Sequence, residues 1–382
     1  MSYTRARRAS ALAVAGRGRR AYREHVRIAL VSTPFVAVPP PSYGGTELVV
    51  HALARALARA GHEVTVFATG DSRVPRLRAL FPSPIWPPDP YTELLHCRFA
   101  AREIATLGFD VVHAHAAALL AFADELGAPL VYTVHHSADP TLARYYRATP
   151  AAHHVAISAR QAALLSPAPR DVVHHGLEPE MYPDCARGGD DVLFLGRLAW
   201  VKAPDLAIEA ARRAGLRIVV AGRVHARDEA PERWREQVLE PALRAPGVSW
   251  LARADLAMKR RLFARSRALA VPLRWDEPFG LVMIEAMLAG CPVVAERRGA
   301  APELVEHGQT GFLVSGVEEM ADALRRAPGL DRAAIQARAR RLFSAQRMAA
   351  GYEAVYRRVA EVSVAVDVRA ASGEDGWTTH VH

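Results

Sequence analysis

A chain of 382 residues predicts two domains, because a domain usually holds roughly 100 to 200 residues. Hydrophobic residues make up 51% and charged residues 23%, which excludes a largely disordered chain, and no apolar run approaches the roughly 20 residues of a membrane-spanning helix. The net charge of +9 is concentrated in residues 1–27, where eight arginines stand against Glu24, so the remaining 355 residues carry only +2 and do not favour nucleic acid as a partner.

The arginine-rich residues 1–25 predict a disordered basic tail. A transit peptide or an attraction to anionic lipid is the alternative, and a peripheral membrane contact therefore stays open. The three cysteines, Cys97, Cys185 and Cys291, are far apart and form no CxxC pair. A disulfide scaffold or structural zinc site is not expected, and the cysteine pattern favours a cytoplasmic protein.

Strand-like apolar runs and one glycine-marked helix fill residues 26–183, which we predict to be the first domain. The helix is expected at 46–60, with apolar side chains at helical spacing. The strands are continuous apolar runs, as in a parallel sheet that is covered by helices on both faces. They are expected at 26–32, 62–69, 109–115, 129–135 and 153–158.

The same rhythm restarts after a polar linker at 183–191 and predicts a second α/β domain over residues 190–344. Helices are expected at 204–214 and 279–290, and a late helix at 345–362 is followed by a disordered tail, 363–382. Strands are expected at 191–196, 216–222, 248–252, 268–273 and 291–296. Two doubly wound α/β domains predict a ligand in the cleft between them, at the carboxyl ends of the strands.

Gly44 and Gly45 follow the first strand and precede its helix. Without a Cβ atom, this backbone allows a phosphate or sugar to approach closely, and the helix start directs N–H groups at an anion. A plain tight turn explains the pair equally well.

Glu277 and Glu285 stand eight residues apart in EPFGLVMIEAM, with Glu277 just outside a predicted helix and Glu285 inside it. A helical rise of about 1.5 Å per residue places the two carboxylates roughly 12 Å apart. That distance is too long for the carboxylate pair of a glycoside hydrolase, which lies within about 5 to 9.5 Å. It suits two groups that bind opposite ends of one elongated ligand.

Arg197 and Lys202 directly follow a predicted strand at the cleft-facing end of the second domain. A guanidinium and an ammonium can together neutralise a departing diphosphate. Among the histidines, His135 ends a predicted strand in TVHHS and is the expected cleft residue. No HExxH or Cys/His spacing supports a metal site.

Taken together, these motifs resemble the retaining GT-B glycosyltransferases of family 4. The similarity covers roughly residues 26–362, and its most specific part is Glu-x7-Glu followed by AGCPVV, PELV and TGFLV. The resemblance implies two Rossmann-like domains facing a central cleft, with the late helix crossing back to the first domain.

The resemblance also implies roles for single residues. Glu285 would bind the donor ribose, and Glu277 would bind sugar hydroxyls. Arg197 and Lys202 would bind the diphosphate, and His135 would lie near the reacting carbon. The remaining donor-binding positions are backbone or loosely assigned base contacts: Gly44, Gly45, Arg223, Trp250, Phe279, Gly280 and Leu281.

Two positions depart from the family pattern. Ala203 stands where a glycine often follows the lysine, and His174-His175-Gly176 replaces a usual Asn-Gly pair. The Asp-x-Asp motif with which other transferases bind a metal is absent from the sequence. No cofactor and no divalent metal are therefore expected.

The sequence thus predicts transfer of a sugar from a nucleotide diphosphate sugar to an acceptor hydroxyl, with retention at the anomeric carbon. The alternatives are a catalytically silent sugar-nucleotide-binding protein and a GT-B-type sugar-nucleotide epimerase. The acceptor, be it a glycan, a lipid-linked sugar or a small metabolite, stays open, as does the donor base. Residues 81–102 are expected to form an acceptor lid or an ordinary packed loop.

Overall fold

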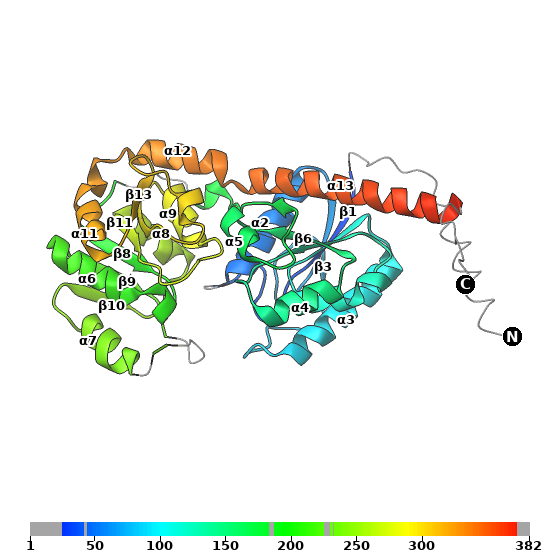
Figure 1. Cartoon of the computed structure of the whole chain (residues 1–382), viewed down its shortest axis with the longest axis horizontal. Helices are drawn as coiled ribbons and strands as arrows, with labels where there is room; N and C mark the ends of the chain where they lie inside the picture. Colours follow the sequence, from blue (N-terminus) through cyan, green and yellow to red (C-terminus); the bar gives the residue numbers. More distant parts are fainter. Residues whose placement is uncertain (1–24, 42–43, 183–186, 225–229, 232, 373–382) are drawn as a thin grey trace, which may run out of the picture.

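A computed structural model describes residues 25–41, 44–182, 187–224, 230–231 and 233–372. Within these ranges the chain forms two α/β domains, which lie side by side along the long axis of the molecule (Figure 1). Predictions for residues 1–24, 183–186 and 373–382, which include most of the N-terminal tail, the end of the C-terminal tail and Cys185, lie outside the described residues.

The N-terminal domain is built on a parallel sheet of seven strands in the order β3-β2-β1-β4-β5-β6-β7. The central strands are buried on both faces, which explains their continuous apolar sequences. The strands are β1 (Arg27–Val31), β2 (Glu63–Phe67), β3 (Leu77–Arg78), β4 (Val111–Ala114), β5 (Leu130–Thr133), β6 (Ala152–Ala156) and β7 (Asp171–Val172). The helices are α2 (Gly45–Arg59), α3 (Pro90–Leu107), η1 (Ala117–Glu125), α4 (Pro140–Ala148), α5 (Ala159–Leu164) and η2 (Pro179–Met181).

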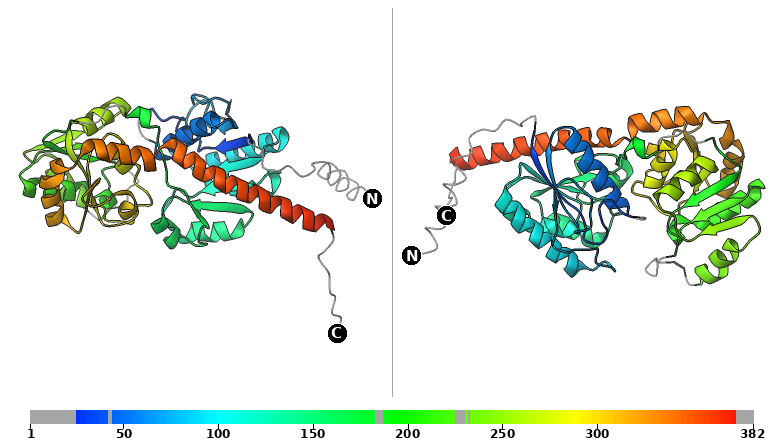
Figure 2. Two further views of the ribbon diagram at one scale, coloured as in Figure 1. Left: turned by 90° about the horizontal axis from the view of Figure 1, so that it is seen from above. Right: turned by 180° about the vertical axis from the view of Figure 1, so that it is seen from behind.

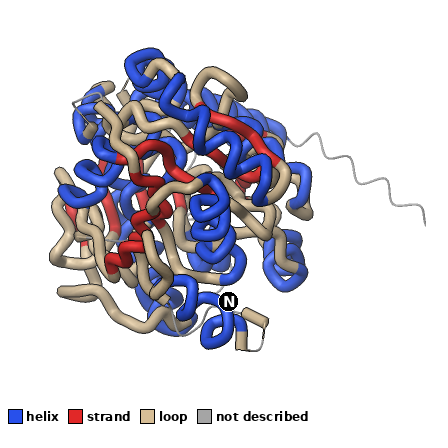
Figure 3. Tube along the Cα trace, turned by 90° about the vertical axis from the view of Figure 1, so that its left-hand side faces the viewer, coloured by secondary structure: helices blue, strands red, loops and turns tan. Residues whose placement is uncertain are grey.

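The C-terminal domain repeats this plan with six parallel strands in the order β10-β9-β8-β11-β12-β13. Viewed along the long axis, helices flank these strands on both sides (Figure 3). The strands are β8 (Asp191–Leu195), β9 (Ile218–Ala221), β10 (Val248–Leu251), β11 (Ser266–Val271), β12 (Val293–Glu296) and β13 (Gly311–Val314). The helices are η3 (Trp200–Lys202), α6 (Pro204–Ala214), η4 (Arg235–Leu239), α7 (Glu240–Leu243), α8 (Leu256–Arg265), α9 (Leu281–Leu288), α10 (Ala301–Leu304), α11 (Val317–Arg326), η5 (Ala327–Gly329) and α12 (Arg332–Leu342).

The last helix, α13 (Ala345–Ser372), leaves the C-terminal domain and runs back along the N-terminal domain (Figure 2). Its Tyr352 and Tyr356 are fully buried, and their hydroxyls lie 2.7 Å from Thr133 Oγ1 and from His113 Nδ1. The crossing helix is therefore part of the N-terminal core.

Three predictions of local structure need correction. The helix predicted to end at 362 continues to Ser372, so the tail predicted from 363 is helical in its first part. Residues 90–102, predicted as part of a lid or loop, belong to α3, because Asp89 caps its first turn by accepting a hydrogen bond from Thr92 N at 2.8 Å. Helix α9 begins at Leu281, so helical rise does not apply to the loop from Glu277 to Gly280.

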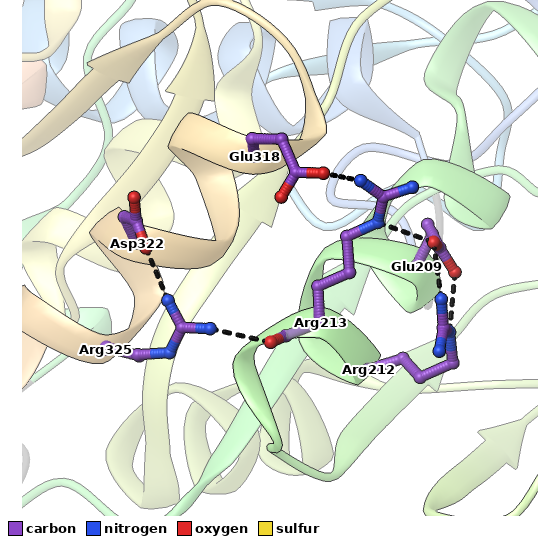
Figure 4. A network of polar contacts seen from close by, with 6 residues as sticks. All are labelled: Glu209, Arg212, Arg213, Glu318, Asp322 and Arg325. Carbon is purple, nitrogen blue, oxygen red and sulfur yellow. Dashed lines mark hydrogen bonds and ion pairs between the residues drawn. The ribbon is translucent and has the colours of Figure 1, made fainter.

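On the outer surface of the C-terminal domain, arginines and acids link α6 to α11 (Figure 4). Arg212 binds Glu209 through two bonds of 2.8 Å, and Arg325 donates to the Arg213 carbonyl at 2.6 Å. The hydrogen bonds from Arg212 and then from Arg213 to the Glu209 carboxylate lower its pKa to about 2. The network lies on the solvent side of both helices and plays no part in the site described next.

Candidate active site

The two domains meet where the carboxyl ends of their strands come together. In the C-terminal sheet the chain order reverses between β8 and β11, and in the N-terminal sheet between β1 and β4. Such switch points open a crevice in doubly wound sheets. Across this crevice, the Ser158 hydroxyl donates to the Pro278 carbonyl at 2.7 Å, and the rings of His175 and Phe279 lie 5.0 Å apart.

Glu277 lies in the loop after β11 and forms an ion pair with Lys202, which belongs to η3 beyond β8. The Trp275 indole N–H donates to Glu277 Oε2 at 2.9 Å, and the Lys202 ammonium lies 5.0 Å from the centre of the Trp275 ring. The structure thus brings the predicted lysine and carboxylate together. Both are largely shielded, with 21% and 11% of their side chains exposed, so the ammonium is held in place before a ligand arrives.

A second ion pair, which sequence reasoning missed, supports this arrangement. Arg274 Nη1 donates to Asp205 Oδ1 and to the Trp200 carbonyl, both at 2.9 Å, and it joins the loop after β11 to η3. Next to it, Ala203 adopts a left-handed conformation with φ 54°. The glycine that often stands here in the family would adopt this conformation without steric strain.

Glu285 lies in the buried part of α9, where Oε1 contacts the Lys259 ammonium and accepts a hydrogen bond from the Tyr182 hydroxyl at 2.9 Å. Burial and the neighbouring carboxylate raise the pKa of Tyr182. Lys259 was missed because it lies on α8, 26 residues from Glu285, with no local pattern to mark it.

Of the two predicted glycines, Gly45 lies close to the C-terminal domain. A Cβ atom on Gly45 would lie 3.2 Å from Leu281, the first residue of α9. A Cβ atom on Gly44 would lie 2.8 Å from the carboxylate of Glu47, which accepts a hydrogen bond from Thr33 at 2.7 Å. A side chain at Gly45 would thus enter the space between the start of α2 and the start of α9, whereas one at Gly44 would meet residues of its own domain.

Gly280 caps α9 with φ 89°, a left-handed conformation that favours glycine. The side chain of the preceding Phe279 is buried against the histidines of the other domain. The backbone of this loop therefore lies at the crevice, and the assignment of Phe279 and Gly280 to the donor sugar stays a prediction.

His135 follows β5 at the crevice and belongs to a row of histidine rings. His115 Nδ1 lies 2.9 Å from His135 Nε2, and the His135 ring stacks on His175 at 5.3 Å. Burial, followed by the neighbouring histidines, lowers the pKa of His115 and of His135, and that of His175 falls to about 3. These rings are consequently neutral at pH 7. His175, which the sequence marks only as a departure from the family pattern, and His115 were not predicted to lie beside His135.

The remaining predicted residues are less closely grouped. Arg197 follows β8 and is partly buried. The next residue, Leu198, donates its backbone N–H to the Arg223 carbonyl at 3.0 Å. Trp250, on the edge strand β10, is 49% exposed and donates to the Gly222 carbonyl at 2.8 Å. Among the described contacts none joins Arg223 or Trp250 to either glutamate, so their assignment to the nucleotide base stays a prediction.

Beside Glu277 the crevice opens into a hollow of about 210 Å³. It is lined by Ser137, Arg160 and Gln161 of the N-terminal domain and by Trp275 and Glu277 of the other. A ligand bound at Glu277 would therefore contact both domains.

No group of three or more potential metal ligands occurs among the residues that the structure describes. In the same part of the chain, no helix is both long and apolar enough to cross a bilayer.

Comparison with known proteins identifies the family. Residues 43–180 match the family model for Glycosyltransferase Family 4, and residues 189–327 match Glycosyl transferases group 1. D-inositol 3-phosphate glycosyltransferase of Mycolicibacterium paratuberculosis is 30% identical over 357 residues, which span 78% of this chain and 80% of the relative. The chain belongs to glycosyltransferase family 4. A second relative with the same name, from Mycobacteroides abscessus, is also 30% identical. The matched residues span 81% of this chain and 84% of that relative.

Solved structures show the same GT-B fold as this family 4 member. AviGT4, a glycosyltransferase involved in avilamycin A biosynthesis, superposes with a TM-score of 0.68 at 24% identity, covering 88% of this chain and 98% of its own. Anabaena HepE in complex with UDP and glucose gives a TM-score of 0.66 at 18% identity, covering 87% of this chain and 99% of HepE. The predicted GT-B architecture is confirmed.

Proposed function

We propose that this glycosyltransferase moves a hexosyl group from a nucleotide diphosphate sugar to an acceptor hydroxyl, with retention and without a divalent metal. The observation that carries this proposal is the shielded contact of Lys202 with Glu277 at the switch point of the C-terminal sheet. A ligand that offers a diphosphate to the ammonium and sugar hydroxyls to the carboxylate matches this pair of opposite charges.

The donor would extend from Glu285 to Glu277 across the start of α9. Glu285, held by Lys259 and Tyr182, would accept hydrogen bonds from the ribose hydroxyls. HepE, a structural relative, was solved with UDP-glucose, and this makes UDP-glucose the first donor to test here.

In the reaction, the bond between the anomeric carbon and the diphosphate oxygen breaks while the acceptor oxygen bonds to the same face of that carbon. The acceptor proton passes to the leaving phosphate oxygen, so no protein nucleophile is required. Lys202 and Arg197 would stabilise the charge that grows on the diphosphate, and neutral His135 would orient the acceptor or donor hydroxyls. This cationic pair is the reason for proposing metal independence.

Thermal-shift measurements with UDP, GDP, ADP, dTDP and their glucose conjugates, with and without EDTA, test the donor site. A ligand at 100 times its dissociation constant adds about 2.7 kcal/mol to the stability of the folded state. We expect one nucleotide to raise Tm in EDTA, and Glu285→Gln to weaken that rise. The proton coupling at the anomeric carbon of the product then reports retention or inversion, and no rise with any nucleotide would contradict the proposal.

A further inference from the structure

We propose that helix α5 is a polar bridge that holds His135 in register with Glu277, and that Gln161, Ser158 and Glu303 are its positioning residues. The inference rests on the roles proposed above for His135 and Glu277. "The α5 bridge" below means Ser158, α5 itself and the side chain of Glu303.

On the N-terminal side, one buried amide holds the backbone on both sides of His135. Gln161 Nε2 donates to the carbonyl of Val134 at 2.9 Å and to that of His136 at 2.8 Å, and the side chain is only 2% exposed. Its Oε1 accepts from Ile157 N at 2.8 Å, which fixes the orientation of the amide. The position of His135 is therefore set relative to the first turn of α5.

On the C-terminal side, the same turn holds the residues on both sides of Glu277. Ser158 donates to the carbonyl of Pro278, and Arg160 binds the Asp276 carboxylate through two contacts of 3.2 Å. Glu303 accepts from the backbone N–H groups of Ala159 and Arg160, both at 2.8 Å. Glu277 is thus positioned from its two neighbours, as His135 is.

The two sides meet within one turn, because Ser158 Oγ also accepts a hydrogen bond from Gln161 N at 3.0 Å. A continuous chain of hydrogen bonds consequently runs from the His135 loop through Gln161 and Ser158 to Pro278. Gln161 is the buried residue of this six-residue helix. Directional hydrogen bonds therefore fix the orientation of this helix.

The bridge also borders the hollow beside Glu277, because Arg160 and Gln161 line it. A shift of α5 would change the width of this hollow and the distance between the two proposed reacting groups. Displacements of about 1 Å in an active site can reduce turnover by about 10²-fold.

Two variants release one side of the bridge each. Gln161→Met keeps the shape of the side chain but removes its bonds to the His135 loop, and Ser158→Ala removes the bond to Pro278. With UDP-glucose as the probe, we expect Gln161→Met to slow the release of UDP by about tenfold or more. The dissociation constant of UDP-glucose should not change. Ser158→Ala should also weaken binding of UDP-glucose relative to UDP, since Glu277 would hold the sugar.

Gln336→Met is the matched control. Gln336 is also buried, and its amide donates to the carbonyls of Tyr182 at 3.2 Å and Leu288 at 2.8 Å, outside the bridge. The two glutamine variants lose the same kind of bonds, so a similar loss of stability with different turnover separates positioning from folding. Equal turnover of Gln161→Met and Gln336→Met would overturn the proposal.

A second readout does not depend on activity. The Trp275 indole N–H donates to Glu277 and reports on its loop, and its ¹⁵N–¹H signal can be assigned with Trp275→Phe. In the full chain, we expect Gln161→Met to shift this signal although Gln161 bonds only to the N-terminal domain, and Gln336→Met to leave it unchanged. An unshifted signal in Gln161→Met refutes the bridge, whereas a wild-type protein that binds no nucleotide sugar refutes only the proposed function.

Discussion

The two sides of the crevice are built from opposite kinds of chemistry. The C-terminal side holds paired full charges, Lys202 with Glu277 and Lys259 with Glu285. The N-terminal side holds a row of uncharged histidine rings, among them His135 and His175, whose burial suppresses protonation. The charged side suits a diphosphate donor, and the neutral side suits hydroxyl groups that must be oriented without attracting the donor's charge.

The strongest test of this comparison removes one cation from the charged side. Lys202→Ala should lower the transfer rate by roughly 10²- to 10³-fold, because a positioned charge on the leaving group contributes a few kcal/mol to the transition state. Steady-state release of nucleotide diphosphate measures the effect. Arg244→Ala, which removes an exposed surface cation of the same domain, should change the rate by less than about twofold.

Glu285→Gln separates binding from stability on the same side. The change leaves the Lys259 ammonium, 14% exposed, without its counter-charge, and we expect a loss of about 3 kcal/mol in the free energy of unfolding. The double variant Glu285→Gln/Lys259→Met should recover most of that stability, as measured by urea unfolding. Nucleotide affinity should remain weak in both, and recovery of affinity in the double variant would contradict the assignment of Glu285 to the ribose.

Acid should lower the stability of the N-terminal domain through its buried histidines. Burial lowers the pKa of His96 to about 4 and that of His113 to about 3, whereas an unfolded histidine titrates near 6.5. Their contribution to the free energy of unfolding is fully present above about pH 6.5. It is lost as the pH falls toward the pKa values of the folded protein, because only the unfolded chain then binds the protons. In that window, each such histidine should lower the free energy of unfolding by about 1.4 kcal/mol for every unit by which the pH falls.

The free energy of unfolding at pH 7.5, 6 and 5 measures this slope. His96→Gln retains a donor for the Ser32 carbonyl, 3.1 Å away, and should reduce the slope by the share of one histidine. A slope that does not change would mean that His96 already titrates normally in the folded protein.

The smallest effect is expected far from the crevice, in the surface network of Figure 4. Glu209→Gln removes the negative charge beside both neighbouring arginines, but exposed ion pairs contribute little. The change should move Tm by less than about 1 °C in a calorimetric scan, and it should reduce the dependence of Tm on salt. A larger loss would show that charge pairs stabilise this domain at its surface as well as in its site.

The sequence predicts the charged side well and the neutral side poorly. Arg197, Lys202, Glu277 and Glu285 stand next to strand ends or within one short motif, so local pattern places them near the crevice. The contact of Lys202 with Glu277 joins residues 75 positions apart and follows from the parallel order of β8 and β11. Strand order is the step that a single sequence does not fix.

The partners that were missed depend on tertiary contacts without a local signature. Lys259 is one of several basic residues on α8, and only the folded arrangement of the domain brings its ammonium to Glu285. His115 and His175 follow different strands, β4 and β7, and their rings meet His135 only once the sheet is assembled. The extension of α13 beyond 362 was missed because the valines at 362, 364, 366 and 368 alternate there, which is not a helical spacing.

The return of α13 has a consequence for how the protein is made. Tyr352 and Tyr356 complete the N-terminal core by contacting Thr133 and His113, which precede them by 219 and 243 residues. A ribosome must therefore synthesise the entire second domain before the first can close its own interior. During that interval the growing chain carries an unfinished apolar surface, which only the last helix covers.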